Sequence, residues 1–116
     1  DCMAFALAHA GRKFVYSGDA GLCDQLEALC ADADFLIHWC YRLDGELADP
    51  EMMGLTPTPS EIGQMAQRAG VRKLLLTHFR VQMDTSEGHA AALAAMAAAF
   101  DGKSGVLEDL QVYEIG

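Results

Sequence analysis

Residues 58–61 read Thr-Pro-Ser-Glu, a strong helix start, and they lie between two short apolar runs. A threonine N-cap with glutamate three residues later forms a capping box, and proline is favoured at the first helical position. The two runs, 35–39 and 73–77, are nearly continuous, which is typical of strands covered on both faces. Two such strands joined by a helix predict a right-handed βαβ crossover and a parallel sheet.

The segment before the first run also has a clear pattern. Alternation over 3–9 and a strand-like run over 13–17, separated by an Ala-Gly-Arg turn, predict a β-hairpin. We expect a helix after it, because Leu22, Leu26 and Leu29 recur at helical spacing and form one apolar face.

The remaining segments complete the order of elements. The segment 40–57 has no regular period and contains two glycines and two prolines, so we expect a long loop. Asp84 followed by Glu87 predicts a second capping box, and alternation over 110–115 predicts a final strand. The apolar face of the last helix is expected at Leu93, Met96, Ala97 and Phe100. The order β-β-α-β-loop-α-β-α-β belongs to the α/β class.

Charge and length restrict the function. The 116 residues carry a net charge of −9, the wrong sign for a surface that binds by neutralising phosphates, so we expect nucleic acid to be a poor partner. No apolar run approaches the roughly 20 residues needed to cross a bilayer, and no signal-like stretch is recognisable. We therefore expect a cytoplasmic protein without a membrane partner.

The four cysteines are not arranged as a metal or redox motif. They are Cys2, Cys23, Cys30 and Cys40, and none forms a CxxC pair or a zinc-finger spacing. We expect them to be reduced, small apolar residues.

Three predicted strand ends carry polar side chains. Asp19 follows the second strand, His38 closes the third and His78 follows the fourth. If these strands are parallel, the three side chains converge at one edge of the sheet, where α/β proteins bind ligands, and could hold zinc or another divalent ion. Each also has a structural interpretation: Asp19 as a helix cap, and His38 and His78 as core histidines. His9 and His89 are expected to be solvated.

Several motifs resemble one known family. They are 14–21 (FVYSGDAG), 35–38 (FLIH), 58–63 (TPSEIG) and 75–79 (LLTHF). In this order they resemble the C-terminal half of the metallo-β-lactamase fold, an αββα sandwich. The resemblance is greatest to the branch with ribonuclease Z, phosphodiesterases and arylsulfatase-like hydrolases. Residues 1–116 are therefore expected to form the C-terminal half of such a domain, with the N-terminal half absent from this chain.

The resemblance implies a metal site. In that family the aspartate matching Asp19 bridges two metal ions, and the histidine matching His78 binds one of them. Two divalent ions, most consistent with zinc, would lower the pKa of a bound water and supply a hydroxide. The implied function is hydrolysis of a small ester, phosphodiester or lactone, a small-molecule substrate. His38 and Trp39 are candidates for the substrate pocket, with Trp39 equally compatible with core packing.

The chain also departs from the family. The His-x-His-x-Asp-His motif and one further histidine ligand belong to the N-terminal half. The His-Glu-Ala-Thr and His-Ser-Thr segments are replaced here by 38–41 (His-Trp-Cys-Tyr) and 56–58 (Thr-Pro-Thr). Both side chains associated with leaving-group protonation are absent, which with the negative charge argues against transfer-RNA processing.

Two further interpretations stay open. A metal-free binding or scaffold domain would keep the fold without the chemistry, and an intact metal motif upstream would argue against it. A thiol-redox protein is a weaker third, because no two cysteines have a redox spacing. The expected partner within the domain is the missing N-terminal half, and a homo-oligomer is compatible with the sequence.

Overall fold

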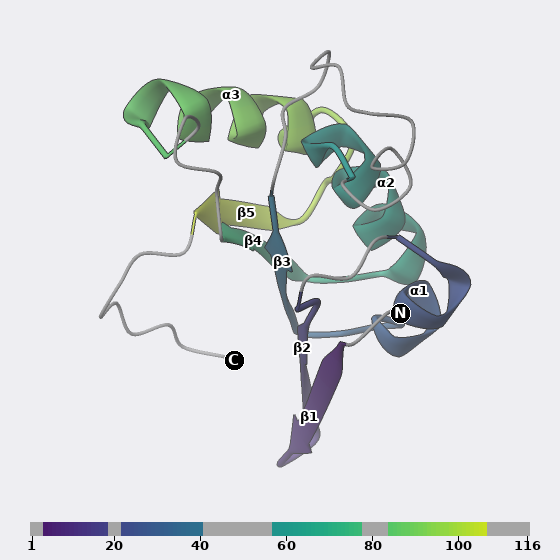
Figure 1. The fold of residues 1–116 in the computed structure, drawn as a ribbon. Coiled ribbons are helices and arrows are strands. Elements are labelled where there is room, and N and C mark those ends of the chain that lie inside the picture. The colour runs from purple at the N-terminus through teal and green to yellow at the C-terminus, as the bar shows by residue number, and fades with distance from the viewer. Residues whose placement is uncertain (1–3, 19–21, 41–56, 78–83, 107–116) are drawn as a thin grey trace.

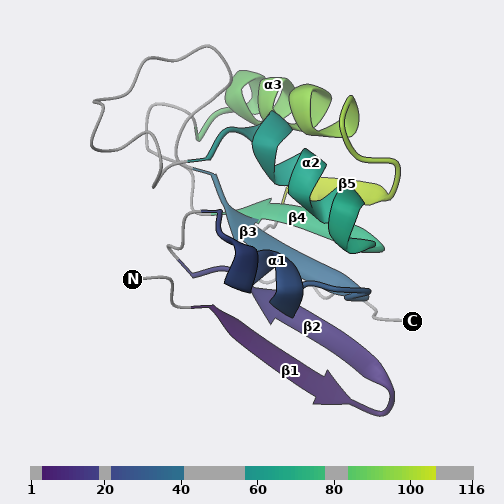
Figure 2. The same ribbon diagram turned by 90° about the vertical axis from the view of Figure 1, so that its right-hand side faces the viewer.

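The computed structural model describes residues 4–18, 22–40, 57–77 and 84–106. Five strands form one sheet in the order β1-β2-β3-β4-β5, and three helices cover one face of it (Figures 1 and 2). The strands are β1 (Phe5–His9), β2 (Arg12–Tyr16), β3 (Phe35–Trp39), β4 (Lys73–Thr77) and β5 (Lys103–Val106), and the helices are α1 (Asp24–Leu29), α2 (Pro59–Ala69) and α3 (Ser86–Ala97). Strand β1 is antiparallel to β2, and the other neighbouring pairs are parallel. The α/β class is confirmed. No described helix is long and apolar enough to cross a membrane.

The hairpin turns at Ala10 and Gly11, whose φ angles of 53° and 79° are both left-handed. A two-residue turn with both residues in this region matches the twist of the strands, and it pairs His9 with Arg12. The predicted hairpin is confirmed.

Helix α2 begins as the sequence predicts. The Thr58 hydroxyl accepts a hydrogen bond from the Glu61 amide (3.3 Å), and the Glu61 carboxylate accepts one from the Thr58 amide (2.9 Å). The helix ends at Gly70, whose φ of 80° is a left-handed conformation that glycine adopts without strain. Both ends of α2 are therefore fixed by local sequence.

Helix α3 begins one residue later than predicted. Its N-cap is Thr85, whose hydroxyl accepts from the Gly88 amide (3.0 Å), so the expected capping box of Asp84 with Glu87 is wrong. Asp84 lies outside the helix, where its carboxylate is 2.8 Å from His89 Nε2. The buried positions of α3 are Gly88, Ala92 and Met96, with Phe100 buried beyond its end, whereas Ala97 is exposed.

The core lies between the sheet and the helices. Val15, Leu36, Leu74 and Leu76 supply it from the strands, and Leu26, Ile62, Met65, Ala66, Ala92 and Met96 supply it from the helices. Burial of this apolar surface is the main favourable contribution to folding. This core also supports the ends of β2, β3 and β4, where the sequence predicts polar residues that could bind a ligand.

Three cysteines are described, and all three are free thiols. Cys30 and Cys40 are buried, and Cys23 is partly buried. Burial raises the pKa of the Cys30 thiol to about 11, so this thiol stays protonated near neutral pH. These observations agree with the expected reduced cysteines, and Cys2 lies outside the described residues.

The last described strand is β5, which pairs with β4 through Lys73 opposite Lys103. Its sequence, Lys-Ser-Gly-Val, has no alternation and gave no strand prediction. The strand predicted over 110–115 lies outside the described residues.

Candidate functional site

Strands β2, β3 and β4 end at the same edge of the sheet, which we call the candidate edge. Their register pairs Tyr16 with Ile37 and Trp39 with Thr77. Gly18 lies just beyond β2 and directly precedes Asp19 in the chain. Thr77 is the last residue of β4 and directly precedes His78. The chain therefore leads to Asp19 and His78 from opposite sides of β3. This confirms that the strands are parallel and end together, although Asp19 and His78 themselves lie outside the described residues.

The end of β2 is attached to β3 by Ser17, which is fully buried. Its amide donates to the carbonyl of Ile37 (2.9 Å), and its hydroxyl accepts from the amide of Trp39 (3.1 Å). The same hydroxyl is 2.9 Å from the Gly18 carbonyl, to which it donates. Sequence reasoning did not identify Ser17, although a serine between a strand and a glycine turn is the available signal.

The end of β3 is attached to β4 in a similar way. The Trp39 carbonyl lies 2.8 Å from His38 Nδ1, and the amide of Cys40 donates to the Thr77 carbonyl (2.8 Å). The Trp39–Cys40 peptide group is thus held on one side by an imidazole and on the other by β4. The described backbone that precedes each predicted ligand, at Gly18 and at Thr77, is therefore attached to β3.

His38 is a neutral, buried imidazole. Burial lowers its pKa to about 4, opposed in part by the hydrogen bond to Trp39. Because a carbonyl oxygen only accepts, the proton lies on Nδ1, and Nε2 presents a lone pair. Within the described ranges, Nε2 is buried and has no hydrogen-bond partner.

Strand alternation places His38 on the face that carries Leu36 and Cys40 in the core, and Trp39 on the other face. Trp39 is 8% exposed and His38 is fully buried. Their assignment to a substrate pocket therefore stays a prediction, and the interpretation of His38 as a core histidine agrees with its burial.

The interpretation of Asp19 as a helix cap does not fit the start of α1. Cys23 is the N-cap of this helix, four residues beyond Asp19. Asp19 is therefore not the N-cap residue of α1, and its assignment as a metal ligand stays a prediction.

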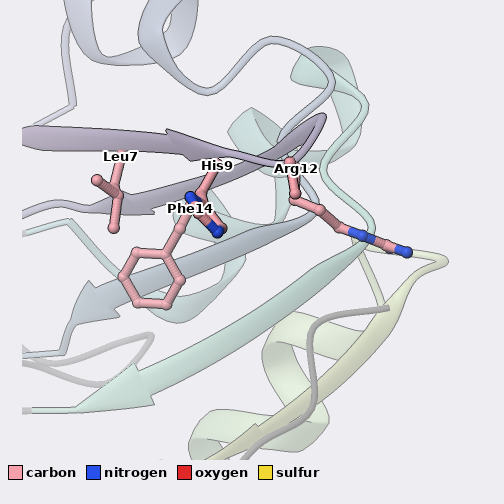
Figure 3. Close-up of a pocket in the computed structure, with 5 residues that line it drawn as sticks. Leu7, His9, Arg12 and Phe14 are labelled. Atoms are coloured by element: carbon pink, nitrogen blue, oxygen red, sulfur yellow. The ribbon is translucent and has the colours of Figure 1, made fainter.

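The described residues contain no group of three or more His, Cys, Asp or Glu side chains that could hold a metal ion. A pocket of about 490 Å³ lies on the hairpin, lined by Leu7, His9, Ala10, Arg12 and Phe14 (Figure 3). Because β2 starts at Arg12 and runs toward Ser17, this pocket is at the opposite end of the strand from the candidate edge. His9 is exposed, as expected.

Comparisons with known proteins identify relatives of the chain. Residues 1–79 match the family described as the beta-lactamase superfamily domain. A ribonuclease Z of Methanosarcina mazei is 44% identical over 73 residues, covering 59% of this chain and 22% of that protein. A ribonuclease Z of Streptomyces avermitilis is 35% identical over 100 residues, covering 86% of this chain and 32% of that protein.

Two solved structures have the same fold. The metallo-beta-lactamase fold protein YhfI of Bacillus subtilis has a TM-score of 0.76 at 23% identity, covering 90% of this chain and 41% of that one. The short form of human tRNase Z has a TM-score of 0.69 at 24% identity, covering 97% of this chain and 38% of that one. The metallo-β-lactamase fold expected from the motifs is confirmed. The chain spans about a fifth to a third of the curated relatives described here.

The expectation that nucleic acid is a poor partner is wrong, because the relatives at 44% and 35% identity are named ribonuclease Z. A net charge is an average over the chain and does not describe the field at one site. Five of the eight basic residues lie at the amino-terminal ends of strands, namely Arg12, Lys13, Arg72, Lys73 and Lys103.

Proposed function

This chain belongs to the beta-lactamase superfamily, and from that premise we propose that it supplies part of a metal-dependent hydrolase that cleaves phosphodiester bonds in RNA. The observation that carries the proposal is the common edge of β2, β3 and β4, from which the chain continues to Asp19 and His78. The names of the ribonuclease Z relatives support the choice of a phosphodiester over a carboxylic ester or a lactone.

Asp19 and His78 are the proposed metal ligands. A carboxylate has two oxygens and can join two cations, and a neutral imidazole is a common zinc ligand. When bound, two divalent ions, most consistent with zinc, would provide a hydroxide nucleophile near neutral pH. The contribution of the described residues is to attach the backbone that precedes Asp19 and His78 to β3, through Ser17, Trp39 and Thr77.

The face of the sheet away from the helices supports a second proposal, that residues 1–116 form the C-terminal half of the domain. Phe5 and Leu7 on this face are 60% and 65% exposed. Beside them Phe14 and Phe35 stack with ring centroids 5.7 Å apart. Apolar side chains grouped on one face of a sheet favour a covering partner. The sheet of the N-terminal half, which completes the αββα sandwich, would be that partner.

A non-catalytic binding domain is the alternative, and one feature favours it. The residue after His38 is Trp39, where the family motif has glutamate, so an acid associated with leaving-group protonation is missing from this chain. Metal content separates the two proposals, because a scaffold has no need of the ligands.

The test uses the complete protein and three substrates. Metal content is measured by elemental analysis, and hydrolysis is measured on a transfer-RNA precursor, on bis(p-nitrophenyl) phosphate and on p-nitrophenyl acetate. Metal-dependent cleavage of the RNA by the wild type, but not by Asp19→Ala, supports the proposal. A metal-loaded protein that hydrolyses only the acetate contradicts the RNA assignment. A protein that retains no metal after purification with added zinc supports the scaffold.

A further inference from the structure

The hydrogen bonding between β2 and β3 changes at Ser17 from a backbone acceptor to a side-chain acceptor. In a parallel sheet, an amide that donates to Ile37 would be followed by a bond from the Trp39 amide to the Ser17 carbonyl. The structure has the first bond, at 2.9 Å. In place of the second, the Trp39 amide donates to the Ser17 hydroxyl at 3.1 Å. A side chain thus substitutes for the main-chain acceptor, and the backbone is able to leave the sheet at this point.

The direction of departure is also fixed by the same hydroxyl. It donates to the carbonyl of Gly18 at 2.9 Å, and Gly18 has a left-handed φ of 59°. A peptide group is planar, so a carbonyl that is held in place sets the direction in which the chain continues. The hydroxyl therefore acts in both its roles, as acceptor from Trp39 and as donor to Gly18.

Burial increases the importance of the two hydrogen bonds that the Ser17 hydroxyl makes. Ser17 is fully buried, so water does not compete for its hydroxyl or replace it when it is removed. Without the hydroxyl, the Trp39 amide would lose this acceptor, or the Ser17 carbonyl would rotate toward it and redirect the chain at Gly18. The loss of a buried hydrogen bond is unfavourable, so the second outcome is favoured.

We propose that Ser17 is a positioning residue for the metal-binding carboxylate of Asp19, an inference that rests on the proposed function. Its hydroxyl attaches the backbone that directly precedes Asp19 to the end of β3, next to the strand that leads to His78. Groups that orient a metal ligand typically change metal affinity by 10- to 100-fold when they are lost. Ser17 should therefore influence metal affinity more than its effect on stability alone would predict.

The test compares variants of the complete protein. Ser17→Ala removes the hydroxyl, and Ser17→Thr retains it. Gly70→Ala is the matched control, because Gly70 has a φ of 80° and an added Cβ would lie 2.9 Å from an Asp32 carboxylate oxygen, at the other end of the sheet. Zinc affinity is measured by competition with a chromophoric chelator at a temperature where every variant is folded, and thermal midpoints are measured alongside.

We expect Ser17→Ala to lower zinc affinity at least tenfold and Ser17→Thr to retain most of it. Gly70→Ala should lower the thermal midpoint without changing the affinity. If Ser17→Ala does not fold, Ser17→Cys carries the same expectation, because a thiol is a weak donor and acceptor. Wild-type affinity in a folded Ser17→Ala or Ser17→Cys protein overturns the inference alone. A wild-type protein that binds no zinc overturns the proposed function, and the inference with it.

Discussion

The Nδ1 atom of His38 lies 2.8 Å from the carbonyl oxygen of Trp39, at the end of β3. This contact fixes the tautomer of a fully buried imidazole. It also ties the ring to the backbone at the end of β3. The ring stays neutral because burial lowers its pKa to about 4. The folded protein therefore resists protonation of a group that the unfolded chain protonates readily.

This difference predicts a dependence of stability on pH. His38 has a pKa of about 4 when folded, against 6.5 as its ordinary value. Between these values the unfolded state binds more protons, so stability is complete above pH 6.5 and falls as the pH decreases toward 4. From pH 7.5 to 5 the loss due to His38 should be about 2 kcal/mol.

Urea unfolding of the complete protein at several pH values measures this effect, with His38→Gln as the comparison because glutamine does not titrate. The variant should have the flatter profile between pH 7.5 and 5. Parallel profiles for the two proteins would mean that the folded state protonates His38 as easily as the unfolded state does.

Gly63 sets the distance between α2 and α3, which lie side by side (Figure 2). A Cβ added at Gly63 would lie 2.8 Å from the backbone oxygen of Met96, an atom that cannot move without moving the helix. Gly63→Ala should therefore destabilise the protein by about 1–3 kcal/mol, the usual cost of overpacking. The exposed neighbour Gln64→Ala should change stability by less than about 0.5 kcal/mol. Equal unfolding midpoints for the two variants would show that α3 shifts freely.

The Thr58 cap makes a separate, local prediction. Thr58→Ala removes the acceptor for the Glu61 amide and should lower the free energy of unfolding by about 1 kcal/mol. Thr58→Ser retains a hydroxyl and should recover most of that loss. Denaturant titration of both variants is the measurement, and an alanine variant as stable as the wild type would show that the capping box contributes nothing here.

The elements that the sequence predicted well are those whose signals are local. The capping box and Gly70 determine α2, and continuous apolar runs determine β3 and β4, because each depends on neighbouring residues. Strand β5 was missed because its Lys-Ser-Gly-Val sequence has no strand pattern and becomes a strand by pairing with β4.

The same distinction applies to the candidate site. The common edge at which β2, β3 and β4 end could be predicted, because parallel strands end together whatever their side chains, and the placement of Asp19 and His78 at that edge stays a prediction. The hydrogen bond between Ser17 and Trp39 could not be predicted, because the two residues are 22 positions apart in the chain and meet only when β2 and β3 are in register. The error about nucleic acid arose from using a whole-chain charge for a local property.

Asp19 gives the most direct test of the proposed chemistry. If its carboxylate joins two cations, Asp19→Ala in the complete protein removes a ligand from both and leaves their charges facing each other. Metal content should then fall by more than one equivalent per protein, and hydrolysis should fall by orders of magnitude, because the hydroxide depends on both ions. Elemental analysis of the purified variant and wild type measures the first effect, and initial rates on RNA measure the second.

Asp24→Ala is the matched control for Asp19→Ala, since Asp24 is an exposed aspartate in the first turn of α1, close to Asp19 in the chain. Its removal should cost a few tenths of a kcal/mol at most, through the lost interaction with the helix dipole, and should leave metal content unchanged. If both variants keep the wild-type metal stoichiometry, Asp19 is not a bridging ligand. The proposal of metal-dependent hydrolysis would then lose its main support in this chain, because His78 alone supplies a single ligand.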